Sequence, residues 1–431
     1  MILRLSSAAA RGLLVLFALV LAAYYFYSGV RYALAAHDLG SNTLSGLAGA
    51  SRLEPDNATN WYLLGRYWQY NLENPDTKRA IQDYKKAASL NPHSPDIWMD
   101  LAAALESEGQ INDAEKAFLA AKQAYPLSPE VSWRYGNFLL RQGTLDAAFA
   151  QIKNAVAVDP KRAPAALALA RRLIPDFGAA LDRVVPSSTT AYLHIINSLS
   201  DQRETDRALQ VWDKLADIHP RFVLSDSFEL IGELVQERKI SEAGRIWNQS
   251  LGFAGISTAP GPRGSLIWDG GFETDISGGG FAWRFPYAFP GGQLNLDTSV
   301  KHSGKRSLRL TFNGNYNADL ENLCELVAVH PDSSYRFSGW VRTDSLTTDQ
   351  GVRFGLTPLG RAAYPVVWTN EIHGTNPWTN VELQWKSASD VNGLQICISR
   401  QPSSGFDNKI SGSAWIDDVT LFPETGENIH P

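Results

Sequence analysis

The stretch from Pro95 to Pro126 reads PDIWMDLAAALESEGQINDAEKAFLAAKQAYP and is the clearest copy of an internal repeat. The prolines that end three successive copies are 34 residues apart: Pro92, Pro126 and Pro160. A fixed period in this range is the signature of an array of stacked helices. Because such arrays present an extended surface to another molecule, the period indicates binding rather than catalysis.

Two helices are expected in this unit, joined by a turn at Gly109. The first has one apolar face, formed by Trp98, Leu101, Ala102 and Leu105, and the second has another, formed by Ala114, Phe118 and Ala121. These residues resemble the tetratricopeptide repeat position for position. The following unit matches through Gly136, Leu139, Gly143, Ala148, Ile152 and Ala155, and the preceding unit through Trp61, Leu64, Gly65, Trp68, Ala80, Tyr84 and Ala87.

The pattern weakens after Pro160, where residues 164–186 read as a broken unit, and it recovers between residues 192 and 247. We count about six units, two of them degenerate, and expect an α-solenoid over residues 41–255.

The resemblance implies that the first helix of each pair lines a groove for a protein partner. The residues expected there are Tyr62, Arg66, Tyr70, Met99, Trp133, Asn137 and Arg141. Exposed aromatic side chains and arginines are typical of such grooves. The alternative is that these are ordinary solvated positions, with Tyr62 and Trp133 packed between units.

An apolar run from Leu13 to Tyr27 precedes the repeats and ends in an aromatic cluster, Tyr24 to Tyr27. Such rings favour the membrane interface, so residues 1–36 are expected to form a cytoplasmic stub and a membrane anchor. The alternative is a cleaved signal peptide, for which Ala33-Leu34-Ala35 offers a site. Under both interpretations, the rest of the chain is exported across the membrane.

The composition changes at a Pro/Gly linker expected over residues 256–264. Beyond it, apolar and polar residues alternate in short segments separated by turn residues. This pattern predicts an antiparallel β-sandwich over residues 265–424, followed by a tail at 425–431. The fold class is therefore multidomain, with helices first and strands afterwards.

Four motifs refine the sandwich prediction. They are LIWDGGFE at 266–273, HSGKRSLRL at 302–310, YRFSGWVR at 335–342 and AWIDDVTL at 414–421. In this order they resemble a carbohydrate-binding module of the family 4/9 type, a galactose-binding-like jelly roll. The resemblance implies the fold more strongly than any ligand.

The same resemblance implies a structural calcium ion between the opening motif, the His-Ser-Gly turn and the closing acidic pair. Glu273 and Asp418 would supply carboxylates and residues 303–305 carbonyl oxygens, which calcium prefers. The alternative is that both carboxylates cap turns or pair with Lys305 or Arg306.

Sugar binding requires an aromatic ring on which a pyranose can stack. The candidates are Trp283, Tyr287, Trp340, Tyr364 and Trp368. For each ring taken alone, a structural role is the alternative. Trp385 and Trp415 occupy apolar positions in the alternating pattern of their segments, which favours a place in the core for both.

Charge and motifs exclude several classes of function. The formal net charge of -6 leaves no basic field for a nucleic-acid backbone. No GxSxG, HExxH or nucleotide-binding glycine motif occurs, and no catalytic constellation is evident. The two cysteines, Cys324 and Cys397, either form one disulfide or are two small buried apolar residues.

These observations favour a non-enzymatic scaffold held at the inner membrane by a single pass, with its bulk in the periplasm or outside the cell. Its repeats would bind a protein and its jelly roll a glycan, in envelope or exopolysaccharide assembly. The alternatives are a protein-only adaptor whose jelly roll binds no sugar and, third, a carbohydrate-active enzyme.

Overall fold

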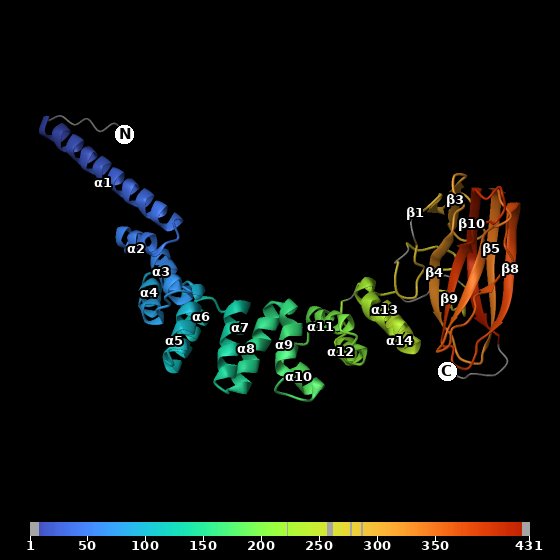
Figure 1. Cartoon of the computed structure of the whole chain (residues 1–431), viewed down its shortest axis with the longest axis horizontal. Coiled ribbons are helices and arrows are strands. Elements are labelled where there is room, and N and C mark those ends of the chain that lie inside the picture. The colour runs from blue at the N-terminus through green and yellow to red at the C-terminus, as the bar shows by residue number, and fades with distance from the viewer. Residues whose placement is uncertain (1–7, 222, 257–261, 276–277, 286–287, 425–431) are drawn as a thin grey trace. The chain divides into compact units, whose positions relative to one another are not determined.

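The computed structural model describes residues 8–221, 223–256, 262–275, 278–285 and 288–424 (Figure 1). It contains two compact units, Met1–Pro186 and Ser187–Pro431. The units divide ahead of the expected linker, so the last helices share a unit with the sandwich. Residues 257–261 of that linker and the expected tail lie outside the described residues.

The first helix, α1 (Ala8–Gly40), is followed by α2 (Leu44–Leu53). The segment Arg11–Gly40 has a mean hydropathy of 2.1 and is long and apolar enough to cross a membrane. Its aromatic cluster at Tyr24–Tyr27 is exposed. By length and composition this helix fits a transmembrane span or a signal sequence.

Twelve further helices follow in the described part of the chain and form the six expected pairs. They are α3 (Ala58–Tyr70), α4 (Thr77–Leu90), α5 (Pro95–Ser107), α6 (Ile111–Ala124), α7 (Pro129–Arg141), α8 (Leu145–Val158), α9 (Ala163–Ala170), α10 (Phe177–Val184), α11 (Thr189–Asp201), α12 (Thr205–Asp217), α13 (Phe228–Gln236) and α14 (Ile240–Phe253). The expected broken unit corresponds to α9 and α10, which are eight residues long each.

Small residues allow the paired helices to approach closely. A Cβ atom built on Gly65 of α3 would lie 2.7 Å from the ring of Tyr84 in α4. One built on Gly136 of α7 would lie 2.8 Å from Ile152 in α8. Glycine at these positions therefore sets the distance between the helices.

Four of the turns within pairs have the same geometry. The residue after each helix C-cap has a left-handed backbone, with φ of 74° at Gly109, 78° at Gly143, 58° at Arg203 and 62° at Arg238. In each turn, the N–H of the next residue donates to a carbonyl five residues back, at 2.8 to 3.1 Å. Glycine adopts this geometry freely, whereas a residue with a side chain is strained by about 1–2 kcal/mol.

The C-terminal part of the second unit is the predicted sandwich of two antiparallel sheets. One sheet has the order β1-β2-β3-β10-β5-β8 and the other β4-β9-β6-β7. The strands are β1 (Ala288–Phe289), β2 (Gly292–Asp297), β3 (Ser307–Asn313), β4 (Leu320–Ala328), β5 (Ser334–Leu346), β6 (Arg353–Leu359), β7 (Val367–Trp368), β8 (Gly374–Lys386), β9 (Gly393–Arg400) and β10 (Ser411–Pro423).

Alternation along the strands separates the core of the sandwich from its outer faces. In β9, Leu394, Ile396 and Ile398 are fully buried in the core. Gln395 and Cys397 lie between them and therefore point to the outer face of the four-stranded sheet. Trp385 is buried in the core, as predicted. Trp415 is also buried, but it alternates with the core residues Ala414 and Ile416 and lies on the outer face, next to the guanidiniums of Arg309 and Arg342.

The last helix pair packs on the sandwich within this unit. The ring of Trp247 in α14 lies 5.6 Å from that of Trp268 and 6.3 Å from that of Phe281, centroid to centroid. Ile240 reaches the outer face of the sheet, where a Cβ atom on Gly393 would lie 3.2 Å from it. Helices and sandwich therefore share apolar contacts.

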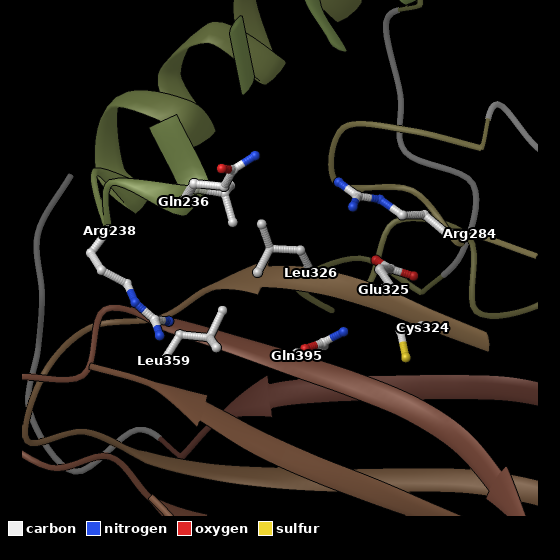
Figure 2. A pocket seen from close by; sticks show the side chains of 9 residues that line it. Gln236, Arg238, Arg284, Cys324, Glu325, Leu326, Leu359 and Gln395 are labelled. Carbon is white, nitrogen blue, oxygen red and sulfur yellow. The ribbon is translucent and has the colours of Figure 1, made fainter. Parts of the chain in front are cut away.

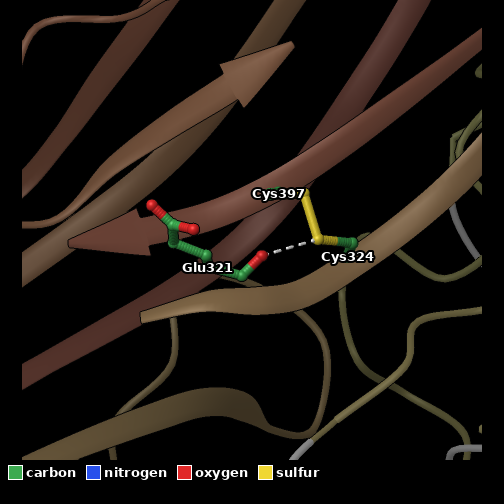
Figure 3. The surroundings of a disulfide bond; sticks show 3 residues. All are labelled: Glu321, Cys324 and Cys397. Carbon is green, nitrogen blue, oxygen red and sulfur yellow. Dashed lines mark hydrogen bonds between the residues drawn. A yellow bond between two sulfur atoms is a disulfide. The ribbon is translucent and has the colours of Figure 1, made fainter. Parts of the chain in front are cut away.

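A disulfide joins the two cysteines across neighbouring strands. Cys324 of β4 and Cys397 of β9 are register partners, separated by 73 residues in sequence. The sulfur of Cys324 also lies 3.2 Å from the carbonyl oxygen of Glu321 (Figure 3). Of the two alternatives left open by the sequence, the structure has the disulfide.

Candidate functional site

A cavity of about 500 Å³ lies between the turn after α13 and the outer face of the four-stranded sheet (Figure 2). This volume is within the range of small-molecule binding sites. The lining residues come from three parts of the second unit: Val235, Gln236, Arg238, Arg284, Cys324, Glu325, Leu326, Leu359 and Gln395.

Two arginines lie on opposite sides of this cavity in Figure 2. Arg238 is the left-handed residue that follows the C-cap of α13, and its carbonyl accepts a hydrogen bond from Asn392 at 3.5 Å. Arg284 is held by two backbone hydrogen bonds with Cys324, and its guanidinium donates to the carbonyl of Gly280 at 3.3 Å. Among the described residues, no carboxylate forms an ion pair with either guanidinium.

The one acidic residue that lines the cavity is Glu325, and it is 1% exposed. Its Oε1 accepts the N–H of Trp268 at 2.6 Å, whereas Oε2 has no hydrogen-bond partner within the described structure. Burial raises the pKa of this carboxyl well above its usual value. Burial therefore disfavours the charged form of Glu325, and the two arginines dominate the charge of the cavity.

The predicted glycan-binding rings do not share one face. Trp283 is 1% exposed and belongs to the core, so its prediction as a sugar platform is wrong. Trp340 lies on β5 of the six-stranded sheet, whereas Trp368 lies on β7 of the other sheet. Tyr287 lies outside the described residues.

Trp368 and Tyr364 are half-buried near the cavity-bearing sheet. A Cβ atom on Gly355 of β6 would lie 2.5 Å from the ring of Trp368, and the Arg353 guanidinium lies 4.2 Å from its centroid. The hydroxyl of Tyr364 donates to Asp390. The Trp368 ring is therefore held between its own sheet and an arginine.

Trp340 has a different neighbour, which the sequence did not suggest. The imidazole of His302 stacks on it, with ring centroids 4.0 Å apart and planes inclined by 16°. Trp378 contacts the same imidazole edge-on at 5.6 Å. His302 therefore covers one face of the Trp340 ring.

The structure brings together the three segments expected to hold calcium. Glu273 Oε1 accepts the N–H of Lys305 at 2.8 Å, and Gly304 leaves no room for a Cβ atom beside it. The carboxylate of Asp418 accepts the Ser303 hydroxyl at 2.8 Å and pairs with His302 Nδ1 at 2.7 Å. Glu273 thus caps the turn, one of the alternatives that the sequence left open, whereas Asp418 binds side chains of the turn and Asp417 accepts the backbone N–H groups of His302 and Ser303.

The fit of an ion to this junction depends on further oxygen atoms. Within the described ranges, no group of three or more His, Cys, Asp or Glu side chains is arranged to hold a metal. A calcium ion at Glu273 and Asp418 would therefore need carbonyl oxygens from the turn.

The groove residues predicted in the first unit form a polar network around Asp100, which is buried. The hydroxyl of Tyr62 donates to Asp100 Oδ2 at 2.9 Å, and Arg134 contacts Oδ1 at 3.1 Å. Arg66 lies 3.9 Å from the same carboxylate and beneath Tyr70, which is exposed. An aromatic and cationic surface therefore exists on α3.

The remaining groove predictions have different outcomes. Met99 is 2% exposed and packs in the helical core, so its prediction as a groove residue is wrong. Arg141 forms two hydrogen bonds with Glu106, at 2.7 and 2.8 Å, and is not free for a ligand carboxylate. Trp133 lies beneath Arg162, and the amide of Asn137 donates to the carbonyl of Trp133.

The sequence analysis did not predict the residues that line the cavity, although two of them depart from the pattern of their neighbours. Arg238 occupies the turn position that glycine fills at Gly109 and Gly143. Glu325 is the charged residue in the apolar run Leu323-Cys324-Glu325-Leu326-Val327. Arg284 and Gln395 do not stand out from their neighbours in the sequence. They come together at the cavity only in the folded chain.

Family models match both the repeat region and the β-sandwich of this chain. Residues 264–405 match the carbohydrate binding domain. Two tetratricopeptide repeat models match residues 72–132 and 108–166. Tetratricopeptide repeats and carbohydrate-binding domains are non-catalytic kinds of domain that bind other molecules. No curated protein matches this chain.

Solved structures similar to each part are distant in sequence. MamA is 16% identical, covering 40% of this chain and 85% of its own, with a TM-score of 0.26. YrrB, described as a TPR protein with an unusual peptide-binding site, is 12% identical, covering 50% and 95%, with a TM-score of 0.26. The CBM22-1 xylan-binding domain from Paenibacillus barcinonensis is 13% identical, covering 38% and 97%, with a TM-score of 0.25.

Proposed function

We propose that this chain is a membrane-anchored, exported, non-enzymatic scaffold that binds a protein through its repeats and a glycan through its sandwich. The observation that carries the proposal is the presence of both binding domains on one chain, behind an apolar helix of membrane-spanning length. Envelope or exopolysaccharide assembly at the inner membrane is the setting that would need all three parts.

The protein-binding half of the proposal rests on α3. A cavity of about 620 Å³ is lined there by side chains that include Arg66, Tyr67, Tyr70 and Leu72. Leu72 is 99% exposed, and exposed aromatic or aliphatic side chains beside an arginine are typical anchors for a partner peptide. The partner is therefore expected to contact this end of the repeats.

Crosslinking followed by capture tests this half. Replacing Tyr70 and Leu72, which line this cavity and are exposed, by Ala is expected to abolish partner capture by the full chain. A matched control is Tyr125→Ala, since Tyr125 is also exposed but lies at the end of α6. Unchanged capture by the double variant would show that the groove has been assigned to the wrong surface.

The glycan-binding half rests on the cavity beside the four-stranded sheet. Affinity electrophoresis of the full chain in gels that contain bacterial or plant polysaccharides is the direct test. Retardation by one class of glycan supports binding. If a chelator abolishes the retardation, the result would also support the proposed calcium ion at Glu273 and Asp418. The role of that ion would be to hold the two ends of the sandwich together.

A protein-only adaptor is the second candidate. The observation that favours it is the separation of the aromatic candidates, because Trp283 is buried while Trp340 and Trp368 lie on different sheets. Under this alternative, the folded chain passes through every polysaccharide gel without retardation and still captures its protein partner.

A further inference from the structure

We propose that the cavity between the turn after α13 and the four-stranded sheet selects acidic sugars, with Arg238 and Arg284 as the residues that bind a uronate carboxylate. This inference rests on the proposed glycan-binding function and names the class of glycan. It also makes the last helix pair part of the binding site, rather than a passive end of the repeats.

Charge is the first argument. Arg238 and Arg284 reach the cavity from opposite sides, and neither forms an ion pair with a carboxylate in the described structure (Figure 2). The acidic residue that lines the cavity, Glu325, is buried, and burial raises its pKa well above its usual value. Two guanidiniums without an ion-pair partner in the described structure therefore face the ligand space, and burial disfavours the charged form of the lining carboxyl, which together favour an anion.

The backbone at Arg238 is the second argument. Glycine fills this turn position at Gly109 and Gly143, whereas Arg203 and Arg238 adopt the same left-handed geometry, with φ of 58° and 62°. Unlike the turn at Arg203, the turn at Arg238 lines the cavity and is tethered to the sandwich through Asn392. The tether fixes the backbone from which the Arg238 side chain enters the cavity.

The rest of the lining suits a sugar better than a bare inorganic anion. Leu326 and Leu359 present apolar surface to the C–H groups of a pyranose ring. The amide of Gln395 offers both a donor and an acceptor to ring hydroxyls.

Calorimetric titration of the full chain in detergent tests the inference. The probes are a galacturonate hexasaccharide and its carboxyl-reduced form, which differ only in the acidic group. We expect the acidic form to bind at least about tenfold more tightly, since a charge-assisted hydrogen bond is worth about that factor. Its affinity should fall as salt is raised from about 0.05 M to 0.5 M.

Two variants and a matched control separate binding from folding. Arg238→Gly introduces the residue type found at Gly109 and Gly143, so it should preserve or raise the melting temperature while weakening the acidic ligand about tenfold. Arg284→Gln should weaken it by a similar factor. Arg203→Gly makes the same change in the preceding repeat, away from the cavity, and should leave the affinity within about twofold.

The outcomes distinguish this inference from the proposed function. Equal binding of both hexasaccharides would overturn the acidic preference and leave glycan binding intact. Tighter binding of inorganic sulfate, or of a sulfated oligosaccharide, would overturn the choice of a carboxylate. Failure of the folded chain to bind either hexasaccharide or any polysaccharide would overturn both proposals.

Discussion

Trp247→Ala tests whether the last helix pair and the sandwich are one folding unit. Trp247 is 5% exposed and contacts both parts, with Phe228 on the helical side and Trp268 and Phe281 on the sandwich side. A buried tryptophan removes about 150–250 Å² from water, or about 4–6 kcal/mol at about 25 cal/mol per Å². Truncation to alanine in cores costs about 3–5 kcal/mol, and we expect a loss in that range.

Urea unfolding of the full chain in detergent, monitored by far-UV and near-UV circular dichroism, measures this loss. In the wild type, α13, α14 and the sandwich should unfold together. In the variant, the transition should move to lower urea, and the helical signal should separate from the tertiary signal of the sandwich.

A control tryptophan lies in the first unit. Trp98 of α5 is half-buried, and its indole N–H donates to the Pro92 carbonyl at 2.8 Å. Trp98→Ala should leave the sandwich transition in place. A loss below about 1 kcal/mol for Trp247→Ala, or coincident shifts for both variants, would refute a shared core between α14 and the sandwich.

Three further predictions follow from single features. Replacing Cys324 and Cys397 by Ser should reduce stability by roughly 4 kcal/mol, as expected for a 73-residue loop, measured as a lower urea midpoint. Burial raises the pKa of Asp83 to about 6, so the folded chain binds this proton more tightly and stability falls as pH rises from about 4 to 6; Asp83→Asn should flatten this part of the pH profile of melting temperature. Calcium at about 1 mM should raise the melting temperature, and Glu273→Gln should remove the rise; an identical rise in the variant would place the ion elsewhere.

The sequence predicted the elements well because their signals are local. The 34-residue period located the helix pairs, and alternation located strands such as β3 and β9. Gly109 and Gly143 marked turns whose left-handed geometry favours glycine. Each of these features is determined by residues that are close together in the chain.

The site was predicted poorly because it depends on contacts between distant segments. Whether Trp283 faces solvent or core depends on Phe272, whose ring lies 5.4 Å away in the folded chain. Met99 lies on the expected helix, but its neighbours in other helices cover it. The cavity joins residues as far apart as Arg238 and Gln395, a pairing that no local pattern contains.

The position of β10 in its sheet has a consequence for the order of synthesis. It pairs with β3 on one side and β5 on the other, although residues 411–423 leave the ribosome after both. Until then the sheet consists of two unjoined halves, and Trp247 has no completed sandwich to cover it. A nascent chain would therefore carry an exposed aromatic surface and open strand edges, the features that chaperones recognise, throughout the elongation of the C-terminal third.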